Sequence, residues 1–373
     1  MINTANNARL SHRVLWGLTF LYIVPGLFSR SPWKPDDAIG FGLSWHFAQA
    51  PFSQWSFGQI GDRVFAQEGL LSAWLGGLLG KLGLLLDIPP DWLDDFMRLG
   101  NVFWLALTAW AVWQTTFWLA KRAELQPENP LGNAPTRTEY ARTVADSSVL
   151  CLLGTLGLLV RSHFQVAELA ELSGIAVMLY AAVRALDKPI GAGWYLGTGI
   201  VLAFFARGFA HWLPFLALLL FSACIHPALR FGLFKRLLRA ALVVAIAFFP
   251  WFFWLQHSPE SQEWWNSWLR WNLDRYLLLD ANTNLSTHLV TTTIKTLAWF
   301  LWPVLPLSGW TLWRYRHALV EAGLRIPTAA TAAGLLVLFS PTPPKKPTTC
   351  HLFRACACCR RWGFLPCGVA WWA

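Results

Sequence analysis

The chain has 373 residues, of which 55% are hydrophobic and only 13% are charged. Soluble domains carry about 25% charged residues, so this composition excludes an ordinary soluble protein and indicates an all-α, polytopic membrane protein. The net charge of +10 would favour a nucleic-acid partner in a soluble protein. Here Lys and Arg lie in short loops between apolar stretches, so we expect the lipid bilayer as a partner and no nucleic acid.

About nine apolar stretches are long enough to cross a bilayer, which takes roughly 17 to 25 residues. They lie near 11–29, 99–119, 146–161, 168–184, 191–206, 209–226, 237–255, 296–313 and 326–340. The first is too long for a signal peptide and lacks a small-residue cleavage site, so we expect a retained helix. Many of the 25 Trp residues fall at the ends of stretches, as in an interfacial belt.

Basic residues gather in four of the loops. They are Lys121, Arg122, Arg137 and Arg142, then Arg184 and Lys188, then Arg230, Lys235, Arg236 and Arg239, then Arg314 and Arg316. The positive-inside rule puts these loops and the N-terminus in the cytoplasm. This orientation requires that 69–88, which is hydrophobic but Gly-rich with Lys81 in its middle, lies in the outer interface. We therefore predict a multi-pass protein of the bacterial inner membrane with interfacial helices in a first outer loop, 30–98.

The polar residues that the orientation does not require all fall on the outer side. They are Asp36, Asp37, Arg63, Glu68, Arg161, His163, Glu168, Arg207, His211 and the stretch 263–275, which contains Asn272 and Arg275. Connecting loops have no need to gather acids, His and Arg on one face. The pattern therefore predicts a site that faces the periplasm. No phosphate loop, nucleophile elbow or metal-ligand pair occurs in the sequence, and we expect no metal and no cofactor.

Two interpretations fit Asp36 and Asp37, which directly follow the first apolar stretch. Carboxylates at a membrane boundary are costly unless they pair, coordinate or react, which makes them candidates for function. Alternatively, they cap an amphipathic helix over 38–49.

Arg207 and the Trp-rich stretch that begins at Pro250 also have two interpretations each. Arg207 lies between two apolar runs, either as a functional cation or as an Arg that snorkels to the interface. The Trp-rich stretch predicts a helix on the membrane surface, and interfacial anchoring explains its Trp residues but not Asn272-x-x-Arg275. His163 and His211 are weak signals, because a lone His is more often structural than a ligand.

The C-terminal part has a different character. From Pro341 onward the membrane pattern ends, and five of the seven Cys fall within 350–367, next to His351. A zinc site is conceivable, but paired Cys-x-x-Cys knuckles are absent. We expect a transmembrane domain over 1–340 and an aberrant, disordered tail over 341–373, from a truncated or frame-disrupted version of a longer chain. Cys151 and Cys224 lie in apolar segments and are expected to be inert.

Four stretches carry a family resemblance. Pro35-Asp36-Asp37-Ala38 is similar to a Pro-Asp-Glu signature, and Gln67-Glu68-Gly69-Leu70-Leu71 through Leu75 resembles a Glu-Lys-Pro-Pro-Leu…Trp-Leu motif. Ala203 to Gly208 resembles Phe-Leu-Thr-Lys-Gly, and Pro250-Trp251 through Tyr276 resembles Pro-Trp…Asn-x-x-Arg-Phe. In their order and spacing, over about residues 10 to 315, they resemble the GT-C-type, polyprenyl-phosphate-sugar-dependent glycosyltransferases. The nearest relatives in that family would be bacterial protein O-mannosyltransferases and the lipid A aminoarabinose transferase.

The resemblance implies a GT-C-like bundle and inverting transfer of a sugar from a polyprenyl-phosphate donor to a lipid, glycan or protein acceptor. It makes Asp36 the catalytic base and Asp37 its support. Arg207 and Arg275 would bind the donor phosphate, with Arg63 and Arg161 as further candidates. The residues expected to line the substrate pocket are Glu68, His163, Glu168, His211 and Asn272. The family's loop Lys is replaced here by Glu68 or Gly69.

A rival interpretation is a non-enzymatic membrane protein, such as a lipid-linked-sugar transporter or an inactive transferase paralogue. A transporter should place polar residues near the bilayer midplane, in broken helices. In this sequence they cluster at one face, which favours the enzyme.

Overall fold

The computed structural model describes residues 11–332 except 30, 33, 127–135, 211, 258, 278–293, 296–297, 315 and 319–324. The side chains at 12, 23, 225, 274–277 and 318 are also outside the description. The expected tail over 341–373 therefore lies outside the described residues, as do parts of the expected spans at 296–313 and 326–340.

The described elements are almost all helices. They are α1 (His12–Ile23), α2 (Pro35–Gln49), η2 (Phe52–Gln54), β1 (Gln59–Ile60), β2 (Arg63–Val64), α3 (Leu71–Leu85), α4 (Pro90–Ala120), η3 (Ala123–Leu125), α5 (Arg137–Leu153), α6 (Leu156–Ser162), α7 (Ala167–Asp187), α8 (Ala192–Arg207), α9 (Trp212–Ile225), α10 (Pro227–Arg230), α11 (Leu233–Leu255), α12 (Pro259–Leu277), α14 (Val304–Arg314) and η4 (Arg316–Ala318). The two short strands form an antiparallel hairpin that pairs Ile60 with Arg63.

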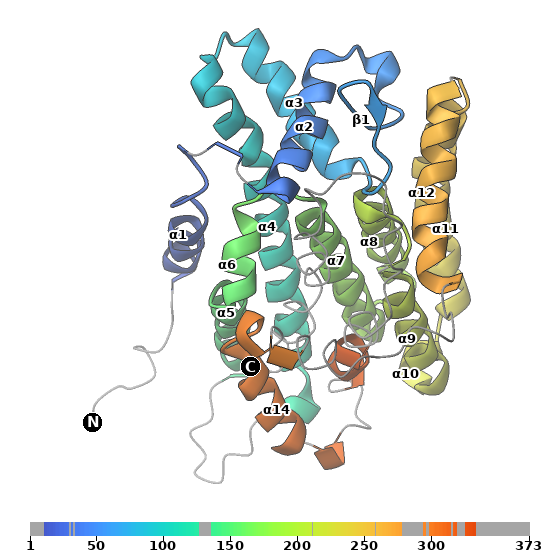
Figure 1. The fold of residues 1–373 in the computed structure, drawn as a ribbon. Coiled ribbons are helices and arrows are strands. Elements are labelled where there is room, and N and C mark those ends of the chain that lie inside the picture. The colour runs from blue at the N-terminus through green and yellow to red at the C-terminus, as the bar shows by residue number, and fades with distance from the viewer. Residues whose placement is uncertain are drawn as a thin grey trace.

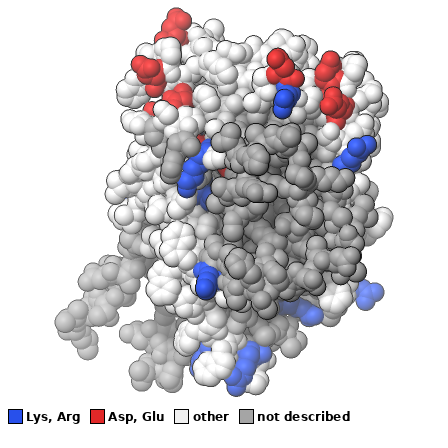
Figure 2. Space-filling model, viewed as in Figure 1, with Lys and Arg blue, Asp and Glu red and all other residues white. Residues whose placement is uncertain are grey.

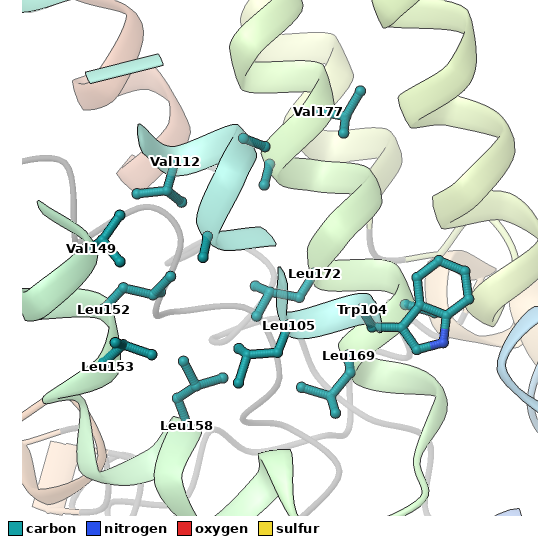
Figure 3. Close-up of a cluster of buried hydrophobic side chains, with 14 of the residues drawn as sticks. Trp104, Leu105, Val112, Val149, Leu152, Leu153, Leu158, Leu169, Leu172 and Val177 are labelled. Atoms are coloured by element: carbon teal, nitrogen blue, oxygen red, sulfur yellow. The ribbon is translucent and has the colours of Figure 1, made fainter. Parts of the chain in front are cut away.

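The bundle is built around α7, which packs against α4 on one side and α8 on the other, while α5 covers α4 and α11 covers α8 (Figure 1). A helix that is apolar on all sides belongs in the interior of a bundle, and 89% of the most apolar part of α7 is buried. Side chains from α4, α5, α6 and α7 converge beside it (Figure 3). Those labelled are Trp104, Leu105, Val112, Val149, Leu152, Leu153, Leu158, Leu169, Leu172 and Val177.

The helix lengths indicate a multi-pass membrane protein. Within the part of the chain that the structure describes, α4, α7 and α11 are long and apolar enough to cross a bilayer. The expected span at 146–161 is instead a broken pair, because the chain bends by 65° between α5 and α6 at Gly154 and Thr155. Other expected spans are shorter than a bilayer requires, since α1 has 12 residues and α9 has 14. The fold class is confirmed, and the count of about nine spans stays a prediction.

The segment 69–88 forms α3, which packs against α2 at one end of the bundle (Figure 1). Its glycines explain how closely the two helices approach. A Cβ at Gly77 would lie 2.5 Å from Cβ of Phe47, and one at Gly80 would lie 2.6 Å from Cβ of Ala48. Small residues at a helix interface let backbones come this close. The Gly-rich composition therefore serves the packing of α3 against α2.

The Trp-rich helix α12 runs alongside α11 (Figure 1). Trp264 and Trp268 are each only 1% exposed. They stack on one another and pack edge-on against Trp251 and Phe204. Interfacial anchoring was the expected role of the Trp residues in this stretch, and it is wrong for these two. They form an aromatic core that fixes α12 to α8 and α11.

Candidate active site

Asp36 and Asp37 lie in the first turn of α2, which begins at Pro35. The N-cap residue is Lys34, and no side chain caps the helix by a hydrogen bond. The two acids are therefore not N-caps, although a helix N-terminus does favour negative charge. Both carboxylates are buried, and each accepts a hydrogen bond from another part of the fold.

Asp36 is held by Arg161 of α6. Nη1 of Arg161 donates to Oδ2 of Asp36 at 3.0 Å, and Nη2 donates to Oε1 of Glu168 at 2.7 Å. One guanidinium thus links α2 to α6 and to the first turn of α7. The guanidinium of Arg161 also lies next to the aromatic ring of Phe164. The ring centroid is 5.8 Å from Cζ of Arg161 and 5.0 Å from Nζ of Lys34. Two cations therefore face the same aromatic ring beside Asp36.

Asp37 lies deeper and is fixed from two sides. The backbone N–H of Gln165 donates to its Oδ1 at 2.8 Å, and Nη2 of Arg98 lies 3.6 Å from its Oδ2. Asp37 and Arg98 are both 0% exposed. Arg98 also pairs with Asp95 at 3.4 Å and with Asp94 at 3.6 Å, through the preceding turn of α4.

Arg207, the last residue of α8, is buried near the same Glu168. Its Nη1 lies 3.8 Å from Oε1 of Glu168 and 3.5 Å from Oε2 of Glu171. The carboxylate of Glu68 also attracts this guanidinium. A snorkelling Arg would extend toward the membrane surface, so burial between carboxylates argues against that interpretation.

The backbone of Gly69, the residue after Glu68, connects the loop before α3 to the end of α8. The N–H of Gly69 donates to the carbonyl of Ala206 at 2.9 Å. A Cβ at Gly69 would collide with the carbonyl of Phe205. Glu68 and Gln165 line a small cavity of about 10 Å³ between α2, α3 and the start of α7. The loop thus docks against the end of α8 only because residue 69 lacks a side chain.

We call these neighbouring charged groups the acid–arginine network. It contains six buried carboxylates, Asp36, Asp37, Asp95, Glu68, Glu168 and Glu171, and three guanidinium groups, Arg98, Arg161 and Arg207. The carboxylates outnumber the guanidinium groups by three. An anionic ligand that enters this site must therefore compete with carboxylates for each Arg.

Asn272 has a structural position next to the network. Its Oδ1 accepts hydrogen bonds from the N–H groups of Phe209 at 3.0 Å and Ala210 at 3.2 Å. These follow Gly208, whose φ of 84° is one that residues with a side chain rarely adopt. Asn272 therefore ties α12 to the turn after Arg207 and holds that turn in place.

The remaining predicted site residues are more scattered. Arg63 is exposed on β2. His163 is half-buried, and its Nδ1 lies 2.6 Å from the carbonyl of Leu159 in the preceding turn. His211 lies outside the described residues, and so does the side chain of Arg275 in α12.

Sequence reasoning missed three members of the network, Asp95, Arg98 and Glu171. Arg98 carries a signal that was available, because Asp94, Asp95 and Arg98 are spaced to pair within one helical turn at the start of an apolar stretch. Glu171 lies three residues after Glu168 within an apolar segment, which places both on one face of the helix.

Comparison of the structure with solved structures identifies the fold of this chain. No family model and no curated protein matches the sequence. The crystal structure of ArnT from Cupriavidus metallidurans bound to undecaprenyl phosphate matches with a TM-score of 0.64 and 15% identity, over 96% of this chain and 58% of that one. The apo state matches with a TM-score of 0.63 and 14% identity, over the same shares of both chains. ArnT is the lipid A aminoarabinose transferase, and this chain therefore has the fold of a GT-C-type glycosyltransferase.

Proposed function

We propose that the protein is a membrane glycosyltransferase that moves a sugar from a polyprenyl-phosphate donor to an acceptor on the periplasmic side. Three observations support the proposal: the GT-C-type fold, the undecaprenyl phosphate bound by ArnT, and the acid–arginine network at one end of the bundle. The chain spans 58% of the length of ArnT, so its own activity, donor and acceptor are part of the proposal.

The observation that carries the proposal is the unequal setting of the two acids. Asp37 is 0% exposed and fixed by Gln165 and Arg98, whereas Asp36 is 8% exposed and paired with Arg161. A supporting acid needs fixed partners, while a base must reach its substrate. This difference supports Asp36 as the base for an acceptor hydroxyl or amine, and Asp37 as its support.

The reaction would need no general acid, because the lipid phosphate leaves as an anion at neutral pH. The acceptor oxygen or nitrogen attacks the anomeric carbon as the sugar–phosphate bond breaks, and Asp36 takes the acceptor's proton. Developing charge at the sugar resembles that in glycoside hydrolysis, and direct displacement inverts the anomeric carbon. Preorganised cations would stabilise the departing phosphate.

Arg161 and Arg207 are the best-placed candidates for that role. Arg guanidinium groups bind phosphate oxygens bidentately. Both already face Glu168, so the donor phosphate would replace a carboxylate contact rather than fill an open position. Lys34 adds a cation over Phe164, next to Arg161. Arg63 and Arg275 remain candidates, with Glu68, His163, Glu168, His211 and Asn272 near the substrate.

The distribution of charge supports an inner-membrane location with the site facing the periplasm. On the face shown in Figure 2, the visible Asp and Glu lie toward the end that contains α2 and α3, whereas Lys and Arg are visible both there and at the opposite end. Under the positive-inside rule that opposite end is cytoplasmic. The active face would then be periplasmic.

A transporter of lipid-linked sugar is the second candidate, because the break between α5 and α6 is a feature that transporters share. One experiment separates the two. A strain that lacks the gene should accumulate lipid-linked sugar, and the purified protein in nanodiscs should release undecaprenyl phosphate from a labelled donor. Movement of the intact donor across vesicles without cleavage of the sugar–phosphate bond would instead identify a transporter. If the protein neither cleaves nor moves the donor, it is an inactive paralogue.

A further inference from the structure

A second cavity lies at the end of the bundle opposite to the acid–arginine network. It has a volume of about 30 Å³ and is lined by residues of α7, α8, α9, α10 and α11 and by Ile326. Its walls are almost entirely apolar, and representative residues are Ala185, Leu196, Leu219 and Ala223. The polar side chains in its lining are Ser222 and Arg236. An apolar cavity of this volume takes a methyl or methylene group in preference to a water molecule.

Arg236 is the unusual member of this lining. It is 4% exposed, and it donates to the carbonyl of Leu229 at 2.7 Å and to the carbonyl of Pro189 at 3.5 Å. Among the residues that the structure describes, no carboxylate lies within 4 Å of its guanidinium. A buried cation whose partners are neutral carbonyls is costly, and an anion beside it would offset that cost.

Further positively charged residues lie near Arg236 in the sequence. Arg230 and Lys235 are exposed in the preceding turns, and Arg239 stacks on Trp194 at 5.7 Å. The acids at this end are already engaged, since Arg122 pairs with both Glu124 and Asp187. The basic residues around Arg236 therefore make this end of the bundle attractive to anions. Basic pockets between membrane helices are places where anionic lipid headgroups bind.

We infer that the cavity and Arg236 form a binding site for an anionic phospholipid of the inner leaflet. The phosphate would bind Arg236, with Arg239 beside it, and one or two carbons of an acyl chain would occupy the cavity between α7 and α9. The site is separate from the proposed donor site, which lies at the other end of α7 and α8. It would tie α10 and α11 to the bundle, because Arg236 already holds the carbonyls of Leu229 and Pro189.

The test uses the full chain in detergent with phosphatidylglycerol, phosphatidylcholine or inorganic phosphate as probes. Native mass spectrometry would measure bound lipid, and thermal unfolding would measure the stabilisation. Phosphatidylglycerol should bind and raise Tm more than phosphatidylcholine. Arg236→Gln should weaken phosphatidylglycerol binding about tenfold, because a charge-assisted hydrogen bond is lost. Arg230→Gln removes an exposed charge from the same end and serves as the matched control, with a much smaller effect.

A second variant keeps the inference falsifiable if Arg236→Gln fails to fold. Ala223→Leu fills the cavity without changing charge and should also weaken phosphatidylglycerol binding, while affinity for undecaprenyl phosphate stays as in wild type. Equal effects of Arg236→Gln and Arg230→Gln would overturn the site. Equal binding of the two lipids would overturn the choice of an anionic headgroup. Stabilisation by inorganic phosphate that depends on Arg236 but not on Ala223 would assign the site to a free anion instead.

Discussion

Arg161 and Asp36 lie 125 residues apart in the chain and are joined by a 3.0 Å hydrogen bond between Nη1 and Oδ2. The contact exists because the chain breaks between α5 and α6, which turns the end of α6 toward the first turn of α2. The other nitrogen of the same guanidinium holds Glu168 of α7. The position of the proposed base is thus set by a helix break that lies far from it in sequence.

Asp36→Asn should lower the transfer rate by about 10² to 10⁴, the usual loss when a general base is removed. The protein should remain inserted and folded, since the amide can still accept from Arg161. Asp94→Asn makes the same chemical change in a half-buried residue at Arg98 and should leave most of the activity. Turnover of labelled donor in nanodiscs measures both variants. Wild-type turnover by Asp36→Asn would show that another residue is the base.

Arg98→Met should destabilise the fold by about 3 to 5 kcal/mol, because it leaves the buried carboxylates of Asp37 and Asp95 without their cation. Arg122→Met is the matched control, because its partners are exposed, and its loss should be about 0 to 1 kcal/mol. Thermal unfolding in detergent compares the two. The double variant Asp37→Asn with Arg98→Met should recover part of the loss. If Arg98→Met costs no more than Arg122→Met, Arg98 does not stabilise the site.

Glu68→Gln should tighten the binding of undecaprenyl phosphate, because it removes a negative charge that competes for Arg207. Arg207→Ala should weaken that binding at least about tenfold, and Arg207→Lys should recover only part of the loss, since the charge returns without the planar fork. Affinity for undecaprenyl phosphate in nanodiscs measures all three. If neither Arg207 variant changes it, the phosphate site lies elsewhere, at Arg161 or Arg63.

Gly69→Ala should detach the loop before α3 from the end of α8, because the new Cβ would collide with the carbonyl of Phe205. The hydrogen bond from the N–H of Gly69 to Ala206 would be lost, and the expected cost is about 1 to 3 kcal/mol. Gly17→Ala in α1 is the control, since its Cβ would meet nothing within 4 Å. Thermal unfolding and transfer activity should both fall for Gly69→Ala alone. Unchanged activity would mean that this docking does not position the site.

The proposed orientation predicts which face a membrane-impermeant thiol reagent can reach. Single Cys residues placed in 123–126 should be protected in intact cells, and Cys at Arg63 in the hairpin should be labelled. The background is a variant that lacks the native Cys residues. Labelling of any position in 123–140 from outside would reverse the orientation, and the site would then face the cytoplasm.

The amino-acid sequence alone determined the class of protein and the position of the main acids. Apolar runs, short basic loops and an Asp pair after the first run are properties of consecutive residues, so they are legible without a structure. The family resemblance, which rests on the order of four short motifs, also predicted the fold that the comparison with ArnT supports.

Only the tertiary structure decided which of these residues meet. Arg98 of α4 joins Asp37 of α2, and Arg207 at the end of α8 joins Glu171 near the start of α7, through packing between different helices. Burial of Trp264 and Trp268 depends on α8 and α11, which a helix-by-helix interpretation cannot weigh. By intrinsic propensity the glycines of α3 disfavour a helix, and only the close packing of α2 against α3 explains their presence. Local sequence fixes periodicity and charge, whereas pairing and burial arise from the packing of distant elements.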